Sequence, residues 1–381
     1  MIPTADNLLE KPNEASEEDA STGATVERYA TFADALEAHR GEHHVIVLQD
    51  FPDPDAIASA FVHRLLSAEY DIDVDILYSG RISHQQNIAL VKLLGFDLTR
   101  YTPAVDLAAY DAAIFVDNQG TTAREIVQML EENKVPPLMI IDHHEAQDRL
   151  QPAFADIRRT VSATSTIYTD YLEQGLLTLE KARKEHVAAA TALLHGIISD
   201  TSSFVFAQPA DFQAAAYLSN IRDADLLRQV MNQARSKQTM ENIRRALENR
   251  MTVENYSIAG IGYLRVADRD SIPQAAEFLM SEENVHTAIV YGILADEQGK
   301  EVLIGSMRTT KITIDPDEFI KDVFGKDATG HYFGGGRRAA GGFEIPVGFL
   351  ADGGGGREEY QTLKWQVYDA QVKEKIFTKI R

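Results

Sequence analysis

The chain has 381 residues and carries 58 acidic against 37 basic side chains, a formal net charge of −21. This negative charge excludes nonspecific electrostatic binding of long duplex nucleic acid or of an anionic membrane, because such binding needs a dense basic surface on the protein. Cysteine is absent, which excludes disulfides, thiolate metal sites and a cysteine nucleophile. The sequence contains no stretch of about 18 uninterrupted apolar residues and no secretory signal pattern at its start, so we expect a soluble, cytoplasmic protein.

The composition predicts an acidic tail followed by two folded domains. Residues 1–28 hold seven acidic and two basic side chains with few large apolar ones, which is typical of a disordered tail. The length and the 44% share of hydrophobic residues suit two domains with cores of their own. We place the first domain at 29–235, a connecting helix at 236–250 and a smaller second domain at 251–381.

In the first domain, short apolar runs alternate with amphipathic patterns, which predicts a parallel α/β sheet with helices on both faces. The expected strands are Val45–Leu48, Asp73–Tyr78, Ala112–Val116 and Leu138–Ile141. The helices expected between and after them are Asp55–Leu66, His84–Leu94, Thr122–Glu132, Thr166–Leu176, Leu179–Ile198, Asp211–Ile221, Ala224–Asn232 and Lys237–Asn249.

The second domain is expected to be a smaller α/β unit. Strands are predicted at Thr252–Ile258, Gly260–Val266, Val285–Leu294 and Glu301–Arg308, and helices at Gln274–Met280, at Asp315–Val323 and from Glu358 onward. A glycine-rich stretch covers Gly330–Gly342, and Gly353–Gly356 is interpreted as a flexible loop.

Acidic and imidazole side chains follow the apolar runs of the first domain. The first run leads into Asp53 and Asp55, the next into Asp117 and the next into Asp142-His143-His144, while a fourth apolar stretch ends at Asp200. Because an open parallel sheet binds its ligands beyond the carboxyl ends of its strands, we expect these side chains to share one crevice. The doublet His43-His44, by contrast, is interpreted as a surface pair.

Like charges packed this closely repel one another unless cations neutralise them. Since the expected ligands are carboxylates and imidazoles without sulfur, Mn²⁺ is favoured over zinc, and Mg²⁺ or Co²⁺ are alternatives. Two such ions about 3.5–4 Å apart would activate a water molecule for attack on a phosphoryl group. The pattern therefore predicts a two-metal phosphoester site.

Four motifs in this order resemble the DHH phosphoesterase family: P-D-P-D-A at 52–56, V-D-N at 116–118, D-H-H at 142–144 and S-D-T at 199–201. The stretch G-H-Y-F-G-G-G-R-R-A-A-G-G-F at 330–343 resembles the glycine-rich motif of the DHH-associated C-terminal domain. By length and layout the chain is most similar to the nanoRNase/pAp phosphatase group. The resemblance implies hydrolysis of short oligoribonucleotides, of linear dinucleotides such as pApA and pGpG, or of pAp, and it implies a homodimer.

The resemblance also implies roles for individual residues. Asp53 and Asp55 would each hold one metal ion, Asp117 and Asp200 would be shared between the ions, His143 would bind the second ion, Asp142 would orient a histidine, and His144 would contact the substrate phosphate. Asp142 and His144 are thus the expected catalytic pair.

The sequence departs from the family pattern at Gln49, where a histidine usually stands four residues before the first motif aspartate. An amide oxygen is a weaker ligand than imidazole, so the first ion would be loosely held, or completed by water, Asp50 or His84. This departure keeps a second hypothesis open, a nucleotide-binding regulator with weakened catalysis.

The glycine-rich stretch is expected to hold the far end of the substrate. Gly334, Gly335 and Gly336 lack Cβ atoms, so their amides can approach an anion closely, and a helix beginning near Arg337 would add its positive end. Arg308 and His331 are candidates for direct phosphate or base contacts. The expected partner is a small nucleotide in a cleft between the domains, and an inorganic polyphosphatase or pyrophosphatase with the same metal chemistry is the alternative.

Overall fold

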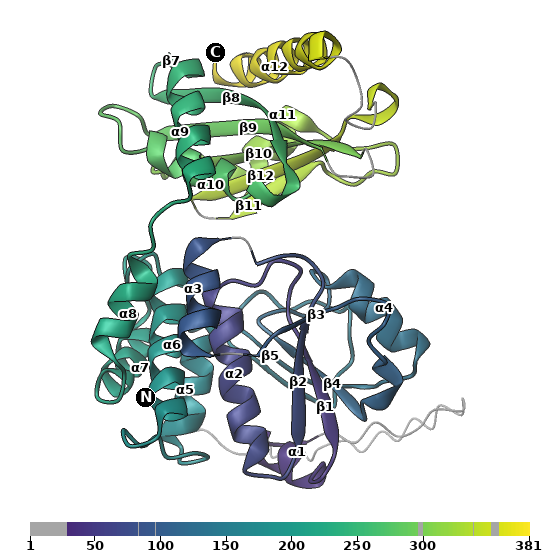
Figure 1. Ribbon diagram of the computed structural model, residues 1–381, viewed down its shortest axis with the longest axis vertical. Coiled ribbons are helices and arrows are strands. Elements are labelled where there is room, and N and C mark those ends of the chain that lie inside the picture. Colours follow the sequence, from purple (N-terminus) through teal and green to yellow (C-terminus); the bar gives the residue numbers. More distant parts are fainter. Residues whose placement is uncertain (1–28, 83, 96, 296–299, 338, 352–357) are drawn as a thin grey trace, which may run out of the picture.

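The computed structural model describes residues 29–82, 84–95, 97–295, 300–337, 339–351 and 358–381. The expected acidic tail and the expected loop at 353–356 lie outside these residues. The described chain forms two bodies stacked one above the other, and residues 232–236 run between them (Figure 1). Among the described residues, no helix combines the length and the apolarity needed to cross a bilayer.

The lower body is built on a parallel sheet with the strand order β3-β2-β1-β4-β5-β6. Its strands are β1 (His43–Val47), β2 (Asp73–Tyr78), β3 (Thr99–Arg100), β4 (Ala112–Val116), β5 (Pro137–Asp142) and β6 (Phe154–Ile157). The predicted parallel α/β fold is confirmed, and β3 and β6 at the two edges are additional strands. His44 lies in the central strand β1 and is fully buried, so the prediction of an exposed His43-His44 pair is wrong for His44.

Helices cover both faces of this sheet (Figure 1). Successive side chains of β1 point to opposite faces, so Ile46 packs with helices α1, α2, α5 and α6 while Val45 and Val47 pack with α4. The helices are α1 (Phe32–Ala38), α2 (Pro54–Ala68), α3 (Gln85–Leu94), α4 (Arg124–Glu132), α5 (Thr164–Glu173), α6 (Lys184–Asp200), α7 (Pro209–Ser219) and α8 (Ala224–Met231). Helix α2 packs against both α5 and α6, so three helices meet behind the carboxyl edge of the sheet.

The upper body holds a mixed sheet with the order β11-β12-β10-β9-β8-β7, in which β8 and β9 pair in parallel and the other neighbours are antiparallel. Helices α9 and α10 pack on one face and α11 and α12 on the other. The elements are α9 (Lys237–Asn249), β7 (Met251–Val253), β8 (Tyr256–Arg265), α10 (Ser271–Leu279), β9 (Thr287–Ala295), β10 (Glu301–Thr309), α11 (Pro316–Phe324), β11 (Gly334–Arg337), β12 (Ala340–Pro346) and α12 (Glu358–Ile380).

Two local predictions in this body are wrong. The chain turns at Glu254, which has a φ of 49°, so the expected strands at 252–258 and 260–266 are instead the short β7 and the long β8. The glycine-rich stretch forms the hairpin of β11 and β12, so no helix begins at Arg337. Glycine is required there because a Cβ on Gly334 would lie 2.2 Å from the carbonyl oxygen of Gly342 on the facing strand.

Candidate metal centre

The acidic residues approach the carboxyl edge of the parallel sheet from neighbouring elements. Asp53 caps α2 after strand β1, where its carboxylate accepts the N–H of Ala56 at 3.0 Å. Asp117 directly follows β4 and has a φ of 58°, which is uncommon for a residue with a side chain. Asp142 is the last residue of β5, and Asp200 is the last residue of helix α6.

His143 stands at the centre of these residues. Its Nε2 lies 3.3 Å from Asp200 Oδ2 and 3.6 Å from Asp117 Oδ1. Within this cluster, two sets of possible ligands have atoms that all lie within 4.8 Å of one another, and they are Asp117 with Asp142, His143 and His144, and Asp55 with His143 and Asp200. Asp53 belongs to neither set, although its charge acts on both Asp55 and Asp117.

The electrostatics of the cluster fit a bound cation. Burial and the neighbouring Asp200 carboxylate raise the pKa of Asp55 to about 7. Burial, reinforced by Asp53 and Asp55, raises the pKa of Asp117 well above its ordinary value. Within the described part of the chain, the buried atoms Asp117 Oδ2 and His143 Nε2 make no hydrogen bond. A divalent ion would neutralise the crowded carboxylates and supply the missing partner for both atoms, and an oxygen and nitrogen ligand set without sulfur suits such an ion.

Helix α5 fixes two of the carboxylates. The backbone N–H groups of Thr164 and Ser165 donate to the two oxygens of Asp55 at 2.7 and 2.8 Å, so this buried carboxylate sits at the positive end of the helix. The Thr164 hydroxyl donates to Asp117 Oδ1 at 2.9 Å. Thr164 and Ser165 were not predicted, because contacts across 47 to 110 residues leave no spacing signal in the sequence.

Both carboxylate oxygens of Asp142 are engaged by neighbouring side chains, and one of them orients His144. Its Oδ1 accepts from His144 Nδ1 at 2.7 Å, and its Oδ2 accepts from Gln119 Nε2 at 2.7 Å. Burial alone would raise the pKa of Asp142, but the hydrogen bond and charge of His144 lower it below its ordinary value. Asp142 therefore stays ionised and fixes the ring of His144. Gln119, which is buried, holds the Asp142 carboxylate through this hydrogen bond, and the sequence analysis did not predict this role.

Gln49, and the two residues expected to replace it as a metal ligand, Asp50 and His84, lie outside the two sets of possible ligands. Gln49 is half-buried in the segment between β1 and α2, and neither set of possible ligands includes it. The carboxylate of Asp50 accepts a hydrogen bond from the Ser79 hydroxyl. His84 directly precedes α3 and lines the cavity between the two bodies.

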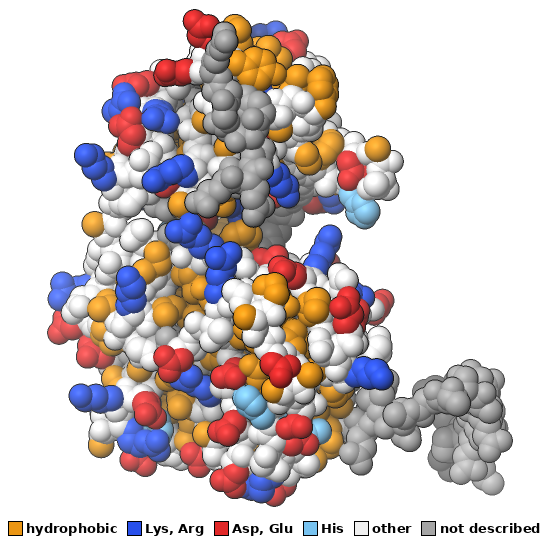
Figure 2. Space-filling view, turned by 45° about the vertical axis from the view of Figure 1, so that its right-hand side comes forward, with side chains coloured by type: hydrophobic (Ala, Val, Ile, Leu, Met, Phe, Trp, Pro, Cys, Tyr) orange, Lys and Arg blue, Asp and Glu red, His pale blue; other side chains and the backbone are white. Residues whose placement is uncertain are grey.

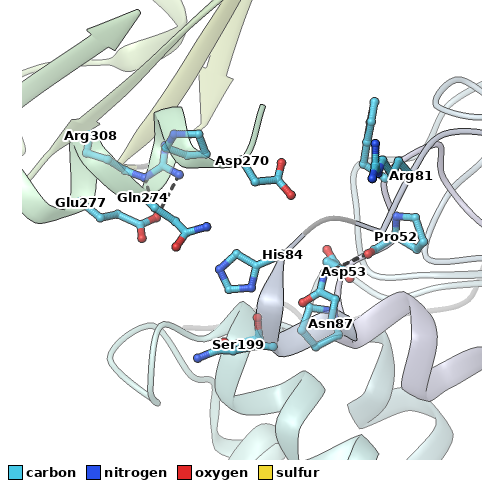
Figure 3. Close-up of a pocket in the computed structure, with 14 residues that line it drawn as sticks. Pro52, Asp53, Arg81, His84, Asn87, Ser199, Asp270, Gln274, Glu277 and Arg308 are labelled. Atoms are coloured by element: carbon cyan, nitrogen blue, oxygen red, sulfur yellow. Dashed lines mark hydrogen bonds and ion pairs between the residues drawn. The ribbon is translucent and has the colours of Figure 1, made fainter. Parts of the chain in front are cut away.

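This cavity has a volume of about 270 Å³ and lies between the metal-binding edge and the upper body. In the close-up, Arg308, Glu277, Gln274 and Asp270 of the upper body face His84, Ser199 and Asp53 of the lower one (Figure 3). Arg308 is held by Glu277 at 3.1 Å and by the Ser306 hydroxyl at 2.8 Å. Arg81 also lines the cavity and forms no ion pair with any described residue. Figure 2 shows the hollow between the bodies with basic side chains on its rim.

The remaining predicted substrate contacts lie elsewhere in the upper body. Gly334 lines a smaller hollow of about 170 Å³ beside Arg269 and Phe343, and Gly335 and Gly336 follow it in β11. His331 is exposed in the turn before β11, where its ring contacts the Thr329 hydroxyl at 2.7 Å. Arg337 ends β11, and its side chain lies outside the described part. The structure thus brings Arg308 to the cavity beside the metal-binding edge and leaves His331 in a separate turn.

The fold and the cluster define a two-body α/β protein with a candidate divalent-metal centre at the carboxyl edge of its parallel sheet. Residues 44–197 match the DHH family, N-terminal domain.

Relatives extend the match beyond this domain. The chain is 35% identical over 301 residues to an uncharacterized protein of Methanocaldococcus jannaschii, covering 78% of this chain and 57% of that protein. It is 28% identical over 259 residues to the cyclic-di-AMP phosphodiesterase GdpP of Bacillus subtilis (strain 168), covering 64% of this chain and 38% of that protein. The chain therefore spans little more than half of the first relative and less than half of the second.

A solved structure shares the fold of both bodies. The crystal structure of an exopolyphosphatase-related protein from Bacteroides fragilis superposes with a TM-score of 0.63 at 16% sequence identity, covering 90% of this chain and 96% of that one. At this identity the similarity shows a common fold.

Proposed function

We propose that the protein is a divalent-metal-dependent phosphoesterase that hydrolyses short oligoribonucleotides, linear dinucleotides such as pApA and pGpG, or pAp. The observation that carries this proposal is the convergence of four carboxylates and two imidazoles beside a cavity that is lined by Asp53 and two arginines. The relationship to a protein named as a cyclic-di-AMP phosphodiesterase supports phosphoester chemistry on a nucleotide. A second support is the resemblance of the upper body's glycine-rich stretch to the DHH-associated C-terminal domain.

Asp55, Asp117, His143 and Asp200 would hold one divalent ion, and Asp53 with Asp117 would hold a second, with Mn²⁺ the expected metal. Bound ions would neutralise the carboxylates, activate a water molecule and draw charge from the phosphoryl oxygens. Helix α5 keeps Asp55 and Asp117 in place for this task through Thr164 and Ser165.

His144 is the group proposed to meet the substrate phosphate. Because its Nδ1 is engaged by Asp142, its Nε2 is the ring nitrogen available to a phosphate oxygen. Asp142 is a positioning residue that holds the ring through Nδ1, so that Nε2 is directed toward the developing negative charge. Gln119 keeps Asp142 in this orientation through the bond to Oδ2.

The cavity sets the size of the proposed substrate. A volume of about 270 Å³ lies near the lower limit of about 300 Å³ for ligand sites, which suits one or two nucleotide units rather than a polymer. Arg81, which has no ion-pair partner among the described residues, is free to bind a phosphate, whereas Glu277 fixes and partly neutralises Arg308. Phe51 exposes its ring at the cavity wall, and aromatic rings of this kind stack on nucleobases.

A substrate panel tests the proposal. Wild-type protein with Mn²⁺ is incubated with 5′-phosphorylated dinucleotides to pentanucleotides, cyclic dinucleotides, pAp and polyphosphate, and the products are separated by chromatography. We expect release of mononucleotides from the shortest RNAs or of phosphate from pAp. The Asp117→Asn, His143→Ala double variant controls for contaminating activity and should lose at least about a hundredfold of the rate.

Two results would contradict the proposal. Turnover of polyphosphate with no cleavage of any nucleotide would assign the site to inorganic substrates. Equal turnover by the wild type and the double variant, together with tight nucleotide binding, would favour the regulator instead.

A further inference from the structure

A cluster of two histidines and a glutamate lies at the amino end of strand β1. His39 directly follows helix α1, Glu42 lies in the turn after it, and His44 is the second residue of β1. One possible ligand atom from each of them lies within 4.8 Å of the other two. Figure 1 shows α1 at the end of the lower body that faces away from the upper body. Because β1 has five residues and is roughly 16 Å long, this cluster is separate from the metal centre at the carboxyl edge of the sheet.

The two imidazoles converge on one carboxylate oxygen. His39 Nδ1 lies 2.7 Å and His44 Nε2 lies 2.9 Å from Glu42 Oε2. The N–H of Glu42 donates to the carbonyl oxygen of His39 at 3.2 Å, and this bond closes the turn that brings the glutamate to the rings. A tetrahedral zinc ion with ligands at about 2.0–2.1 Å keeps them about 3.3 Å apart. The nitrogens would therefore need to draw back from the oxygen by only about half an ångström to admit the ion.

The surroundings of both rings favour metal binding. The hydroxyl of Tyr29 lies 3.0 Å from His39 Nε2, the ring nitrogen that does not contact Glu42. Metal-bound histidines usually donate the N–H of their second nitrogen to such a partner, which leaves Nδ1 of His39 with a lone pair for the ion. His44 is fully buried, and this burial lowers its pKa, so the ring is in the neutral form that binds metals.

The cluster is open to ions from solvent and has a negative charge. The side chains of His39 and Glu42 are 21% and 34% exposed. The neighbouring Arg40, whose charge would repel a cation, is instead paired with Glu37 at 2.8 Å and with Asp71 at 2.9 Å. The charge of Glu42 is therefore available to a bound cation.

We propose that His39, Glu42 and His44 bind one Zn²⁺ ion, separate from the metal centre at the carboxyl edge. Two imidazoles and one carboxylate are a ligand set that zinc favours, whereas the carboxylate-rich centre suits Mn²⁺. Three protein ligands leave the fourth tetrahedral position to a water molecule.

The ion would join the end of α1 to strand β1. Helix α1 packs into the core through Phe32, whose ring stacks on Tyr171 with centroids 4.4 Å apart. A metal that binds the folded arrangement of His39 and His44 stabilises the lower body, because the unfolded chain does not hold these ligands together.

Zinc titrations of the full chain test the site. The background is the Asp117→Asn, His143→Ala double variant, since His143 belongs to both ligand sets of the other centre. We expect this protein to bind one Zn²⁺ per chain, and added His39→Gln to weaken that binding at least about tenfold. In an otherwise wild-type chain, His39→Gln should lower the bound zinc by one ion per chain.

His43→Gln is the matched control for these titrations. His43 is an exposed imidazole next to the cluster, it pairs with Asp75 at 3.2 Å, and it belongs to no ligand set of the cluster. Added to the same background, His43→Gln should leave the zinc affinity unchanged. Thermal melts without metal should show all the proteins folded, and Zn²⁺ should raise the melting temperature of His43→Gln by more than that of His39→Gln.

Cobalt absorption tests the coordination. Four-coordinate Co²⁺ absorbs visible light much more strongly than six-coordinate Co²⁺ with oxygen ligands. With one equivalent of Co²⁺, the background protein and His43→Gln should show the intense visible band, and His39→Gln should lose it.

Three outcomes would overturn the proposal. They are a folded background protein that binds no zinc, a zinc affinity that His39→Gln leaves unchanged, and an equal loss of affinity in His39→Gln and His43→Gln. Zinc binding by the background protein without the intense Co²⁺ band would overturn the tetrahedral coordination.

Discussion

Buried imidazoles make the lower body sensitive to acid at the scale of single residues. His63 in α2 is fully enclosed, with its Nδ1 2.7 Å from the hydroxyl of Tyr168 and its Nε2 without a partner in the described residues. Burial, with a smaller contribution from His44, lowers the pKa of His63 from 6.5 to about 3. The folded protein therefore binds this proton far less readily than the unfolded chain does.

The sign of the pH effect follows from this difference. Between about pH 3 and 6.5 the unfolded state binds more protons, so the stability is fully present above pH 6.5 and is lost as the pH falls. We expect His63→Gln to lessen the loss of unfolding free energy between pH 7 and pH 5 by roughly 2 kcal/mol, as measured by urea titrations. Identical pH slopes in both proteins would show that His63 protonates equally in the folded and unfolded states.

A second prediction concerns Gln49. A histidine at this position, four residues before Asp53, would offer an imidazole ligand where the chain now offers an amide. We expect Gln49→His to bind Mn²⁺ at least several-fold more tightly in calorimetric titrations, with the gain confined to the weaker binding step. Gln119→His is not an equivalent control because it breaks the bond to Asp142, so Gln147→His in the nearby exposed loop serves instead. An unchanged affinity would show that another group already completes the first site.

The sequence predicted which acidic side chains lie together at the sheet edge. It did not predict which residues hydrogen-bond to them. The placement of Asp117 and Asp142 after apolar runs was sufficient to expect them at one sheet edge, and the structure places them there. Thr164, Ser165 and Gln119 could not be predicted, because ordinary polar residues become supports only when distant elements bring them to a carboxylate. Arg308 was predicted to contact phosphate or base directly, and the sequence did not predict that Glu277 on a neighbouring helix pairs with it.

At the scale of elements, the metal-binding edge depends on close packing of α6 against α2 and α5. Gly196 in α6 faces this junction. A Cβ at this position would lie 2.4 Å from Ser165 Oγ and 3.0 Å from both Cα and Oδ1 of Asp55. Glycine is therefore required for steric reasons, although it lowers the intrinsic stability of a helix by about 1 kcal/mol relative to alanine.

We expect Gly196→Ala to displace Asp55 and to weaken Mn²⁺ binding by at least about tenfold, with a lower melting temperature of the metal-free protein. Calorimetry and thermal melts measure the two effects. Adding Ser165→Ala removes the nearest obstructing atom and should recover part of both losses. A single Gly196→Ala variant that is more stable than the wild type and binds metal normally would show that the helices have room to move apart.

Helices and strands with a clear pattern of apolar residues could be predicted from the sequence. Strands that form only because another strand pairs with them could not. Strand β4 and helix α9 have the bounds that their apolar patterns predict. Strand β3 has two exposed residues and is a strand only because β2 lies beside it. Five of the eleven strand residues in the hairpin of β11 and β12 are glycine, which has no strand preference of its own, so the pairing depends on the space available next to β10.

At the scale of the whole molecule, one contact ties the upper body to the segment that carries the first motif aspartate. The guanidinium of Arg269 lies 4.4 Å from the ring centroid of Phe51, two residues before Asp53, and it also pairs with Glu344 on β12. A half-exposed cation–π contact of this kind contributes about 1 kcal/mol, which would favour the observed arrangement of the two bodies about fivefold over any arrangement that breaks the contact. Arg269 therefore favours the arrangement in which the cavity is formed.

We expect Arg269→Ala to increase the radius of gyration in small-angle scattering and to raise the KM for the best substrate of the panel about fivefold, with little change in kcat. The substitution leaves the metal ligands in place, so Mn²⁺ affinity should not change. Arg265→Ala is the matched control, because Arg265 pairs with Asp268 on the same segment and is largely exposed. A rise in KM for both variants would indicate a general effect of positive charge, whereas an unchanged KM for Arg269→Ala would show that other contacts already fix the two bodies in the closed arrangement.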